Sequence, residues 1–475
     1  MRRRAFLGTS LSLVAGGLIR ADPASSITHS RNPARGGSHA IGSPAEPPRP
    51  TPAQLAWQRD ELAMFVHFGI NTFTDREWGD GTDPPAVFAP ASLDARQWAR
   101  AARAAGFRAM ILTAKHHDGF CLWPSRTTAY TVAASPWRNG SGDVVREFVD
   151  ACRAESLRPG LYVSPWDRNH PAYGDSPRYN DVYIGQLTEL LTSYGPLAEV
   201  WFDGANGEGP DGRRQKYDWP RIFGTVRNLQ PDAVIFSDAG PDARWCGNED
   251  GSAGEPCWSM VHPGIVPEPG VFSDEIREHL QHGAPDGTVW RPAEADTSIR
   301  RGWFHHVAED DSVRSVDDLI NLYFTSVGRN SKLLLNVPPT RDGLLHETDI
   351  ARLAAFRRRL DARFETDLAA GAKRAWRRTG SNAAELILEF DRPVRIDCAR
   401  IAEDIEAGQR VAEYALLGSD GIAWEALSRG TTIGHAKLDR FRAETVTAVR
   451  LVITDAVEEP LPVRLSLFPP AATAG

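Results

Sequence analysis

Cysteine is scarce in this chain of 475 residues, and its five cysteines are not arranged as metal ligands. They are Cys121, Cys152, Cys246, Cys257 and Cys398. No two of them have the CxxC spacing, which argues against a zinc site. At least one thiol has no partner within the chain, because the number is odd. Cys246 and Cys257 could pair in an oxidising compartment, but in a domain this large we expect buried free thiols.

An excess of positive charge is also lacking. The formal net charge is −8, with 54 Lys and Arg against 62 Asp and Glu, and the two signs are interspersed. We therefore expect no nucleic-acid partner. A glycine-rich phosphate loop is missing after every expected strand, which argues against an open doubly wound sheet. The remaining composition, 41% hydrophobic and 24% charged, is that of a globular protein with a large core.

The N-terminus has no hydrophobic run long enough to cross a bilayer as a mature helix. Basic residues 2–4 precede a short apolar run and then small residues, which is typical of an export signal. Residues 3–7, Arg-Arg-Ala-Phe-Leu, resemble the twin-arginine signal, whose cargo crosses the membrane folded. We expect residues 1–25 to be this signal and residues 26–52 a flexible linker. The mature protein should be periplasmic or secreted, without a membrane partner.

From residue 53 to residue 360, short apolar segments alternate with amphipathic helical segments. The expected strands cover residues 63–70, 107–113, 160–163, 197–202, 233–236 and 332–337. This alternation indicates a parallel sheet, either an open doubly wound sheet or a barrel. Polar residues directly after many strands favour an α/β fold with a (β/α)8-like barrel, in which one ring of loops collects them. Residues 240–310 follow neither pattern and are expected to be irregular.

Residues 361–475 have a different pattern, with short apolar strands separated by turns and no helical period. Residues 384–390, 414–418 and 448–453 are the clearest of these strands. We expect a C-terminal antiparallel β-sandwich. No cluster of exposed aromatic residues is evident there, so the sequence favours support of the barrel over sugar binding.

Polar and aromatic residues lie near or just after the ends of the first three expected strands. Singly, each has a structural explanation, such as a buried histidine with a satisfied hydrogen bond. Together they would line one pocket with imidazoles, tryptophans and a carboxylate, a mixture that suits a hydroxyl-rich ligand with an apolar ring face. These residues are His67, Glu77, Trp78, His116, His117 and Trp166.

An acid stands directly after the strand at residues 197–202. In a barrel, Asp203 lies where active sites form, although capping of the next helix is an alternative explanation. Hydrolysis of a glycoside needs two carboxyl groups, and Asp203 is the candidate nucleophile. The second acid should come from a later loop, where Glu249 and Glu255 are both available. Spacing alone does not choose between them.

Several separated motifs, in this order, resemble the α-L-fucosidases of glycoside hydrolase family 29. They are His67-Phe68-Gly69, Lys115–Phe120, Glu199–Gly204, and Gly328-Arg329-Asn330 with Leu333–Pro339. The resemblance covers about residues 55 to 360. It implies a barrel-like catalytic domain, a C-terminal β-sandwich, a retaining mechanism and no metal.

The resemblance also implies roles for individual residues. Asp203 matches the nucleophile of the family, and Trp166 falls where a further aromatic residue lines the sugar ring. The residues that match positions holding the fucose are His67, Glu77, Trp78, His116, His117 and Trp201.

Three segments resemble the branch of the family that prefers branched 1,3- and 1,4-linked fucosides. They are Trp78–Asp80, the extension at residues 205–210, and Gly247–Glu249. In that branch the acid/base matches Glu249, and Arg244 resembles an arginine near the pocket.

The sequence thus predicts an exo-acting retaining α-L-fucosidase, without metal or cofactor, that acts on fucosylated oligosaccharides or glycoconjugates. A metal-dependent barrel hydrolase, with His67, His116, His117 and Asp118 as ligands, is one alternative. It is disfavoured because adjacent histidines at a strand end should point in opposite directions, and because no His-x-His pair is present. A non-catalytic fucose-binding protein is the other alternative, disfavoured because both carboxylates are present.

Overall fold

The computed structural model of the protein describes residues 47–471. The expected export signal and most of the expected linker lie outside the described residues. Within residues 47–471, no helix combines the length and the apolar character that crossing a membrane requires.

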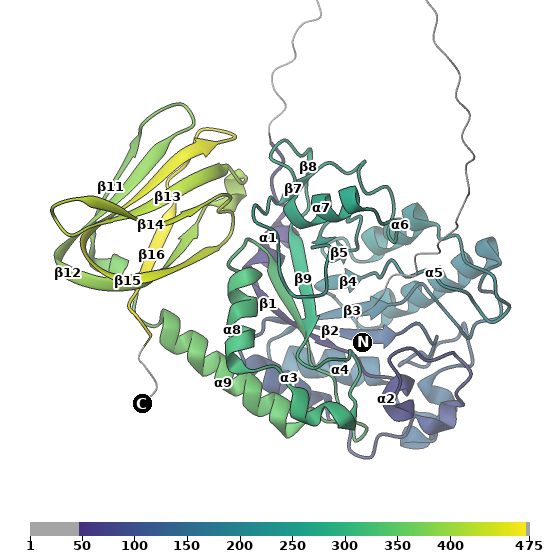
Figure 1. Cartoon of the computed structure of the whole chain (residues 1–475). Helices are drawn as coiled ribbons and strands as arrows, with labels where there is room; N and C mark the ends of the chain where they lie inside the picture. The colour runs from purple at the N-terminus through teal and green to yellow at the C-terminus, as the bar shows by residue number, and fades with distance from the viewer. Residues whose placement is uncertain (1–46, 472–475) are drawn as a thin grey trace, which may run out of the picture. The chain divides into compact units, whose positions relative to one another are not determined.

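Eight parallel strands form a nearly closed barrel in the described part of the chain (Figure 1). Their order is β5-β4-β3-β2-β1-β10-β9-β6, and a parallel bridge between Phe236 and Ala243 links the two ends of the sheet. The expected barrel is therefore confirmed. The strands are β1 (Leu62–Val66), β2 (Ala109–Lys115), β3 (Arg158–Val163), β4 (Glu199–Trp201), β5 (Val234–Phe236), β6 (Arg244–Trp245), β9 (Ala293–Ser298) and β10 (Lys332–Asn336).

Helices connect the strands and lie around the sheet (Figure 1). Many of them begin where a side chain caps the first turn and an apolar face follows, although α2 and α5 have no side-chain cap. Asp94, for example, accepts the backbone N–H of Gln97 and so begins α3, whose Trp98, Ala99 and Ala102 are fully buried. The helices are α1 (Pro52–Arg59), α2 (Ile70–Thr74), α3 (Ala95–Ala104), α4 (Val144–Ala154), α5 (Ser176–Ser193), α6 (Trp219–Leu229), α7 (Asp274–His282), α8 (Val316–Thr325) and α9 (Glu347–Phe364).

The expectation that residues 240–310 are irregular is wrong. This region contains the barrel strands β6 and β9, helix α7, and a hairpin of β7 (Met260–Val261) and β8 (Val289–Trp290). Strand β9 reads Ala-Glu-Ala-Asp-Thr-Ser, and all six residues are buried. The strand can be buried without an apolar run because its two acids have polar partners inside the barrel. A hydrophobic pattern therefore cannot reveal this strand.

The barrel interior contains a buried charge network. The Nζ of Lys332, on β10, lies 2.7 Å from Glu199 Oε2 and 3.1 Å from Glu294 Oε2. It also lies 4.3 Å above the ring of Trp57, whose Nε1–H donates to Glu199. Burial by itself lowers the pKa of Lys332, but the two carboxylates outweigh burial and raise it.

Two carboxylates share this one cation. Burial and the nearby charge of Glu199 accordingly raise the pKa of Glu294 to about 8. The Nε1–H of Trp201 donates to Glu294 Oε1 at 3.0 Å, and the Trp201 ring stacks on Phe236 with 4.5 Å between centroids. The charge network thus sets the position of Trp201, two residues before Asp203.

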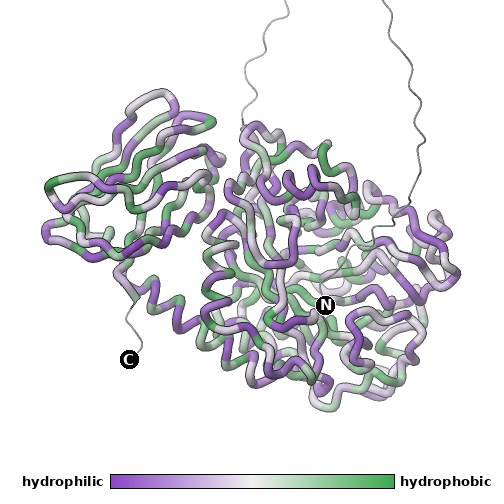
Figure 2. Tube along the Cα trace, viewed as in Figure 1, coloured by the Kyte–Doolittle hydropathy of each residue, from purple (hydrophilic) through white to green (hydrophobic). Residues whose placement is uncertain are grey.

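The C-terminal part of the described chain was expected to be an antiparallel β-sandwich, and its strands are antiparallel and belong to one hydrogen-bonded sheet. Its strand order is β11-β12-β15-β13-β14, with β16 paired to β12. Shifts of register between the long strands β12 and β15 allow them to bend around a core of their own, and hydrophobic stretches alternate with hydrophilic ones along them (Figure 2). The strands are β11 (Lys373–Arg378), β12 (Ala384–Ala402), β13 (Val411–Ser419), β14 (Trp424–Gly430), β15 (Lys437–Ala456) and β16 (Arg464–Phe468).

Buried hydrogen bonds join this sheet to the barrel segments. Gln409, before β13, accepts the backbone N–H of Ser259 at 2.7 Å and the Nδ2–H of Asn330 at 3.2 Å. Glu61, at the start of β1, pairs with Arg400 and His435. Buried polar groups need such partners, so these residues tie the two sets of strands together.

All five cysteines are free and buried. The expectation of buried free thiols is confirmed, and Cys246 and Cys257 do not pair. Burial raises the pKa of both thiols above the ordinary value, so both are held in the neutral form.

Candidate active site

Asp203 lies just beyond the carboxyl end of β4, at the mouth of the barrel. Its side chain is nearly buried, since the residue exposes only 8% of its surface. Oδ1 accepts the backbone N–H of Ala205 at 2.7 Å, and Oδ2 accepts the hydroxyl of Tyr162, from β3, at 3.3 Å. These contacts hold the carboxylate in one orientation, as a nucleophile requires.

His117 is oriented toward Asp203 by its neighbour Ser164. Ser164 uses its single hydroxyl hydrogen on the carbonyl of Trp166 at 2.9 Å, so it accepts the Nδ1–H of His117 at 2.7 Å. The Nε2 of His117 then lies 3.8 Å from Asp203 Oδ2. In the neutral ring, Nε2 is the acceptor atom, suited to a sugar hydroxyl.

His67 is oriented in a similar way by Asn336. The Oδ1 of Asn336 lies 2.9 Å from His67 Nδ1 and also accepts the backbone N–H of His67 at 3.2 Å. The Nδ2 of Asn336 donates to Ser298 and to the carbonyl of Trp303, which assigns the amide orientation. His67 therefore carries its hydrogen on Nδ1 when the ring is neutral.

The rings of His116 and His117 lie side by side, with 4.1 Å between their centroids. The expectation that adjacent histidines diverge is wrong, because β2 ends at Lys115 and both residues lie in the turn that follows. Among residues 47–471, no group of three or more His, Cys, Asp or Glu side chains has a geometry that could hold a metal ion.

Glu77 joins the loop after β1 to the loop after β9. Its carboxylate accepts the backbone N–H groups of Trp303 at 2.8 Å and Phe304 at 3.0 Å, and contacts His306 Nε2 at 2.7 Å. The Nδ1 of His306 contacts Asp75 at 2.6 Å. Burial raises the pKa of Glu77, but the hydrogen bonds from His306 and the backbone outweigh it and lower the pKa. The bond to Glu77 raises the pKa of His306 to about 9, so this is an ion pair at neutral pH.

Three aromatic side chains from different loops surround these groups. The ring centroid of Trp166 lies 5.0 Å from that of His117 and 6.2 Å from that of Trp78. The Nε1–H of Trp166 donates to the carbonyl of Glu208. Trp303 lies 5.0 Å from the ring of His67. Trp78 exposes 43% of its surface and so offers a ring face at the mouth of the site.

The two candidate acids of the later loop have different surroundings. Glu249 is half-buried in the turn after β6, which Asn248 shapes by donating to the carbonyl of Ser252 at 2.8 Å. Glu255 instead pairs with Lys437 of β15 and with Arg329 Nε at 3.4 Å. The carboxylate of Glu255 is thus engaged in ion pairs that connect the loop to the C-terminal sheet.

Arg244 is placed apart from the other predicted residues. It is buried, and its guanidinium donates to the backbone carbonyls of Leu280, Trp258 and Arg291. Burial lowers its pKa. These contacts hold α7 and the β7–β8 hairpin against β6, and a role for Arg244 in substrate binding stays a prediction.

The structure brings together His67, Trp78, His116, His117, Trp166 and Asp203. Glu77 joins them through Phe304, whose ring lies 5.0 Å from that of His116, and Trp201 packs against Tyr162. Sequence reasoning missed Tyr162, Trp303 and His306 in this site. Tyr162 gave no signal because it is part of an apolar strand, where a tyrosine is an ordinary core residue. Trp303 and His306 belong to an aromatic and histidine-rich run, Trp-Phe-His-His, which was the available signal in the region expected to be irregular.

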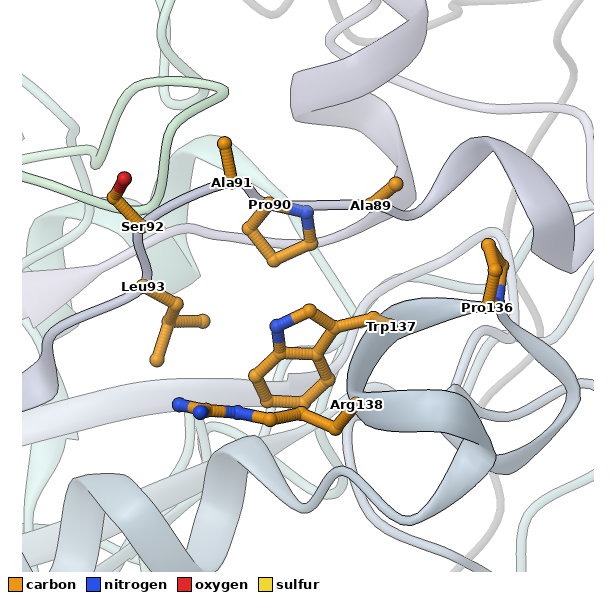
Figure 3. A pocket seen from close by; sticks show the side chains of 8 residues that line it. All are labelled: Ala89, Pro90, Ala91, Ser92, Leu93, Pro136, Trp137 and Arg138. Carbon is orange, nitrogen blue, oxygen red and sulfur yellow. The ribbon is translucent and has the colours of Figure 1, made fainter.

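A separate hollow of about 390 Å³ lies near the start of α3 (Figure 3). Its lining comes from residues 89–93 and 136–138, and the guanidinium of Arg138 lies along the ring of Trp137. None of its lining residues is an acid or belongs to the candidate site. It therefore does not offer the two carboxylates that glycoside hydrolysis needs.

Comparisons with known proteins match most of the chain. Residues 48–362 match the sequence model of the family described as alpha-L-fucosidase. Alpha-L-fucosidase 1 of Arabidopsis thaliana is 42% identical over 452 residues, covering 89% of this chain and 87% of that protein.

Two solved structures share the fold and much of the sequence. A glycoside hydrolase 29 family member from an unknown rumen bacterium has a TM-score of 0.83 at 41% identity, covering 90% of this chain and 78% of its own. The GH29 fucosidase of Ruminococcus gnavus, solved in complex with fucose, has a TM-score of 0.80 at 30% identity, covering 91% of this chain and 98% of its own.

The ion pair of Glu77 and His306 predicts a pH-dependent contribution to stability. The pKa of His306 is raised from 6.5 to about 9, so its contribution is complete below about pH 6.5 and is lost as the pH rises toward 9. The pKa of Glu77 is lowered from 4.5, so its contribution is lost only as the pH falls below about 4.5.

The substitution His306→Gln should therefore lower the free energy of unfolding most between about pH 4.5 and 6.5, and least above about pH 9. Urea unfolding of both proteins across this range measures the difference. His262→Gln, at a surface pair with Asp286, is the matched control and should have a small effect. A loss for His306→Gln that is the same at all pH values would contradict the ion pair.

Proposed function

The chain belongs to the α-L-fucosidase family, glycoside hydrolase family 29, and we propose that it removes terminal α-1,3- and α-1,4-linked fucose from branched glycans with retention of configuration. The observation that carries this proposal is the position of Asp203, an oriented carboxylate at the barrel mouth beside His117 and Tyr162. Its surroundings are histidines with assigned hydrogen positions and tryptophan faces, which suit hydroxyls and the apolar side of a sugar ring.

The proposed reaction is a double displacement. Asp203 attacks the anomeric carbon as Glu249 protonates the leaving oxygen, and water with Glu249 as base then hydrolyses the fucosyl-enzyme. The half-buried position of Glu249 supports this assignment over Glu255, whose carboxylate is engaged by two cations.

The linkage preference is tested by following free fucose from α-1,2-, α-1,3-, α-1,4- and α-1,6-fucosylated oligosaccharides and from an aryl fucoside. Binding energy from the sugar beyond the fucose should raise turnover as well as affinity, so branched 1,3/1,4-fucosides should have by far the highest kcat/KM. Comparable kcat/KM values for aryl and branched fucosides would contradict the preference.

The two carboxylates are separated by substitution. Asp203→Ala should abolish turnover of every fucoside, and azide should restore product of inverted configuration. Glu249→Ala should slow poor leaving groups by roughly 10²–10⁴-fold but spare an aryl fucoside with an acidic phenol, which leaves without a proton. Azide should then give a fucosyl azide of retained configuration.

Glu255→Ala is the matched control for Glu249→Ala, since it removes a neighbouring acid of the same loop. It should keep the leaving-group dependence of the wild type. If Glu255→Ala shows the pattern expected of Glu249→Ala, the acid/base assignment is wrong while that of Asp203 stands.

Export through the twin-arginine route is part of the proposal. Its support is the sequence at residues 3–7, which lies outside the described residues. Changing both Arg3 and Arg4 to Lys should retain the activity in the cytoplasm, measured as fucosidase activity in cell fractions. Unchanged activity outside the cytoplasm would remove the twin-arginine route but not export itself.

A further inference from the structure

Phe272 is an exposed aromatic residue in the segment just before α7. It exposes 52% of its surface. Ser273 caps α7 by accepting the backbone N–H of Ile276, so Phe272 directly precedes the cap. An apolar residue there often packs against the fourth residue of the helix, but that residue is the charged Arg277. Packing onto the helix therefore does not explain the phenylalanine.

The backbone before Phe272 packs against the segment that carries Asp203. A Cβ atom placed on Gly204 would lie 2.4 Å from the backbone nitrogen of Gly270, and one on Gly270 would lie 2.1 Å from the carbonyl oxygen of Gly204. The N–H of Gly270 also donates to Asp238, after β5, at 3.1 Å. Phe272 is thus two residues from a backbone contact with the residue after the candidate nucleophile.

The ring of Phe272 lies near the loop that carries the candidate acid/base. Its centroid is 6.4 Å from that of Trp245, on β6, four residues before Glu249. The Nε1–H of Trp245 donates to Asp296, in β9, at 2.7 Å, which holds the indole at the end of the barrel. Phe272 therefore lies close both to the segment that carries Asp203 and to the strand that leads to Glu249.

We propose that Phe272, backed by Trp245, is the platform on which the pyranose ring of the sugar that carries the fucose stacks. The proposal rests on the proposed function. The acid/base must reach the glycosidic oxygen, so the leaving sugar has to lie on the side of Glu249. The fucose is assigned to buried histidines and Trp201, whereas an exposed ring at the rim suits a unit that continues toward solvent.

The test compares two substrates with the same fucose but different leaving groups. One is a branched oligosaccharide with α-1,4-linked fucose, and the other is α-L-fucosyl fluoride, whose leaving group has no ring. The measured quantity is the ratio of their kcat/KM values. Phe272→Ala should lower this ratio about tenfold, Phe272→Leu by an intermediate factor, and Phe272→Tyr by less than about twofold, because Tyr keeps the flat face.

The control is Ile422→Ala, which removes a side chain that is 92% exposed in the turn between β13 and β14. It should leave the ratio unchanged. An unchanged ratio in Phe272→Ala, in a protein that unfolds at the wild-type temperature, overturns the platform. Failure of the wild type to release fucose from any substrate overturns the proposed function instead, so the two outcomes are distinct.

Discussion

The buried ion network around Lys332 is the constraint on which the barrel depends. Removing ionised groups from water is costly, and the cost is met only where opposite charges and hydrogen bonds replace the water. One lysine on β10 supplies that compensation for Glu199 on β4 and Glu294 on β9, so three strands that are distant in sequence must come together. Trp201 hydrogen-bonds to the same network, and Asp203 follows two residues later.

The histidines of the candidate site above this network are oriented by hydrogen bonds to uncharged side chains. The hydroxyl hydrogen of Ser164 and the amide group of Asn336 donate to backbone carbonyls. The side-chain oxygen of each residue therefore accepts the Nδ1–H of its histidine, His117 or His67, and this fixes the orientation of the ring. Side chains held in this way need little reorganisation when charge develops in a transition state. The ion pair of Glu77 and His306 adds a second kind of tie, between the loops after β1 and β9.

The depth of the site and its rim differ in chemistry. Buried imidazoles and carboxylates line the deep part, where a whole sugar ring would lose its water and every hydroxyl would need a partner. Trp78, beside His117 and Trp166, and Phe272, which we propose as the platform for the leaving sugar, are exposed aromatic rings. Such a gradient suits an enzyme that encloses a terminal sugar and leaves the remainder of the glycan in solvent.

Much of this arrangement was predictable from the sequence alone. Periods of apolar residues indicated six of the barrel strands and the C-terminal sheet, because burial of one face repeats regularly along a helix or strand. The position of Asp203 after an apolar strand placed an acid at the mouth of a barrel, and the separated motifs indicated the family.

Only the tertiary structure decided the remainder. Strand β9 carries acids that are buried because Lys332, Trp201 and Trp245 reach them from other strands, and no local pattern records such partners. The partners of Glu255 and Arg244 could not be read from the sequence either. Glu255 pairs with Lys437, which is 182 residues later in the chain, and the guanidinium of Arg244 donates to backbone carbonyls. Local periodicity reports whether a residue is buried, whereas the choice of partner depends on contacts between segments that meet only when the chain has folded.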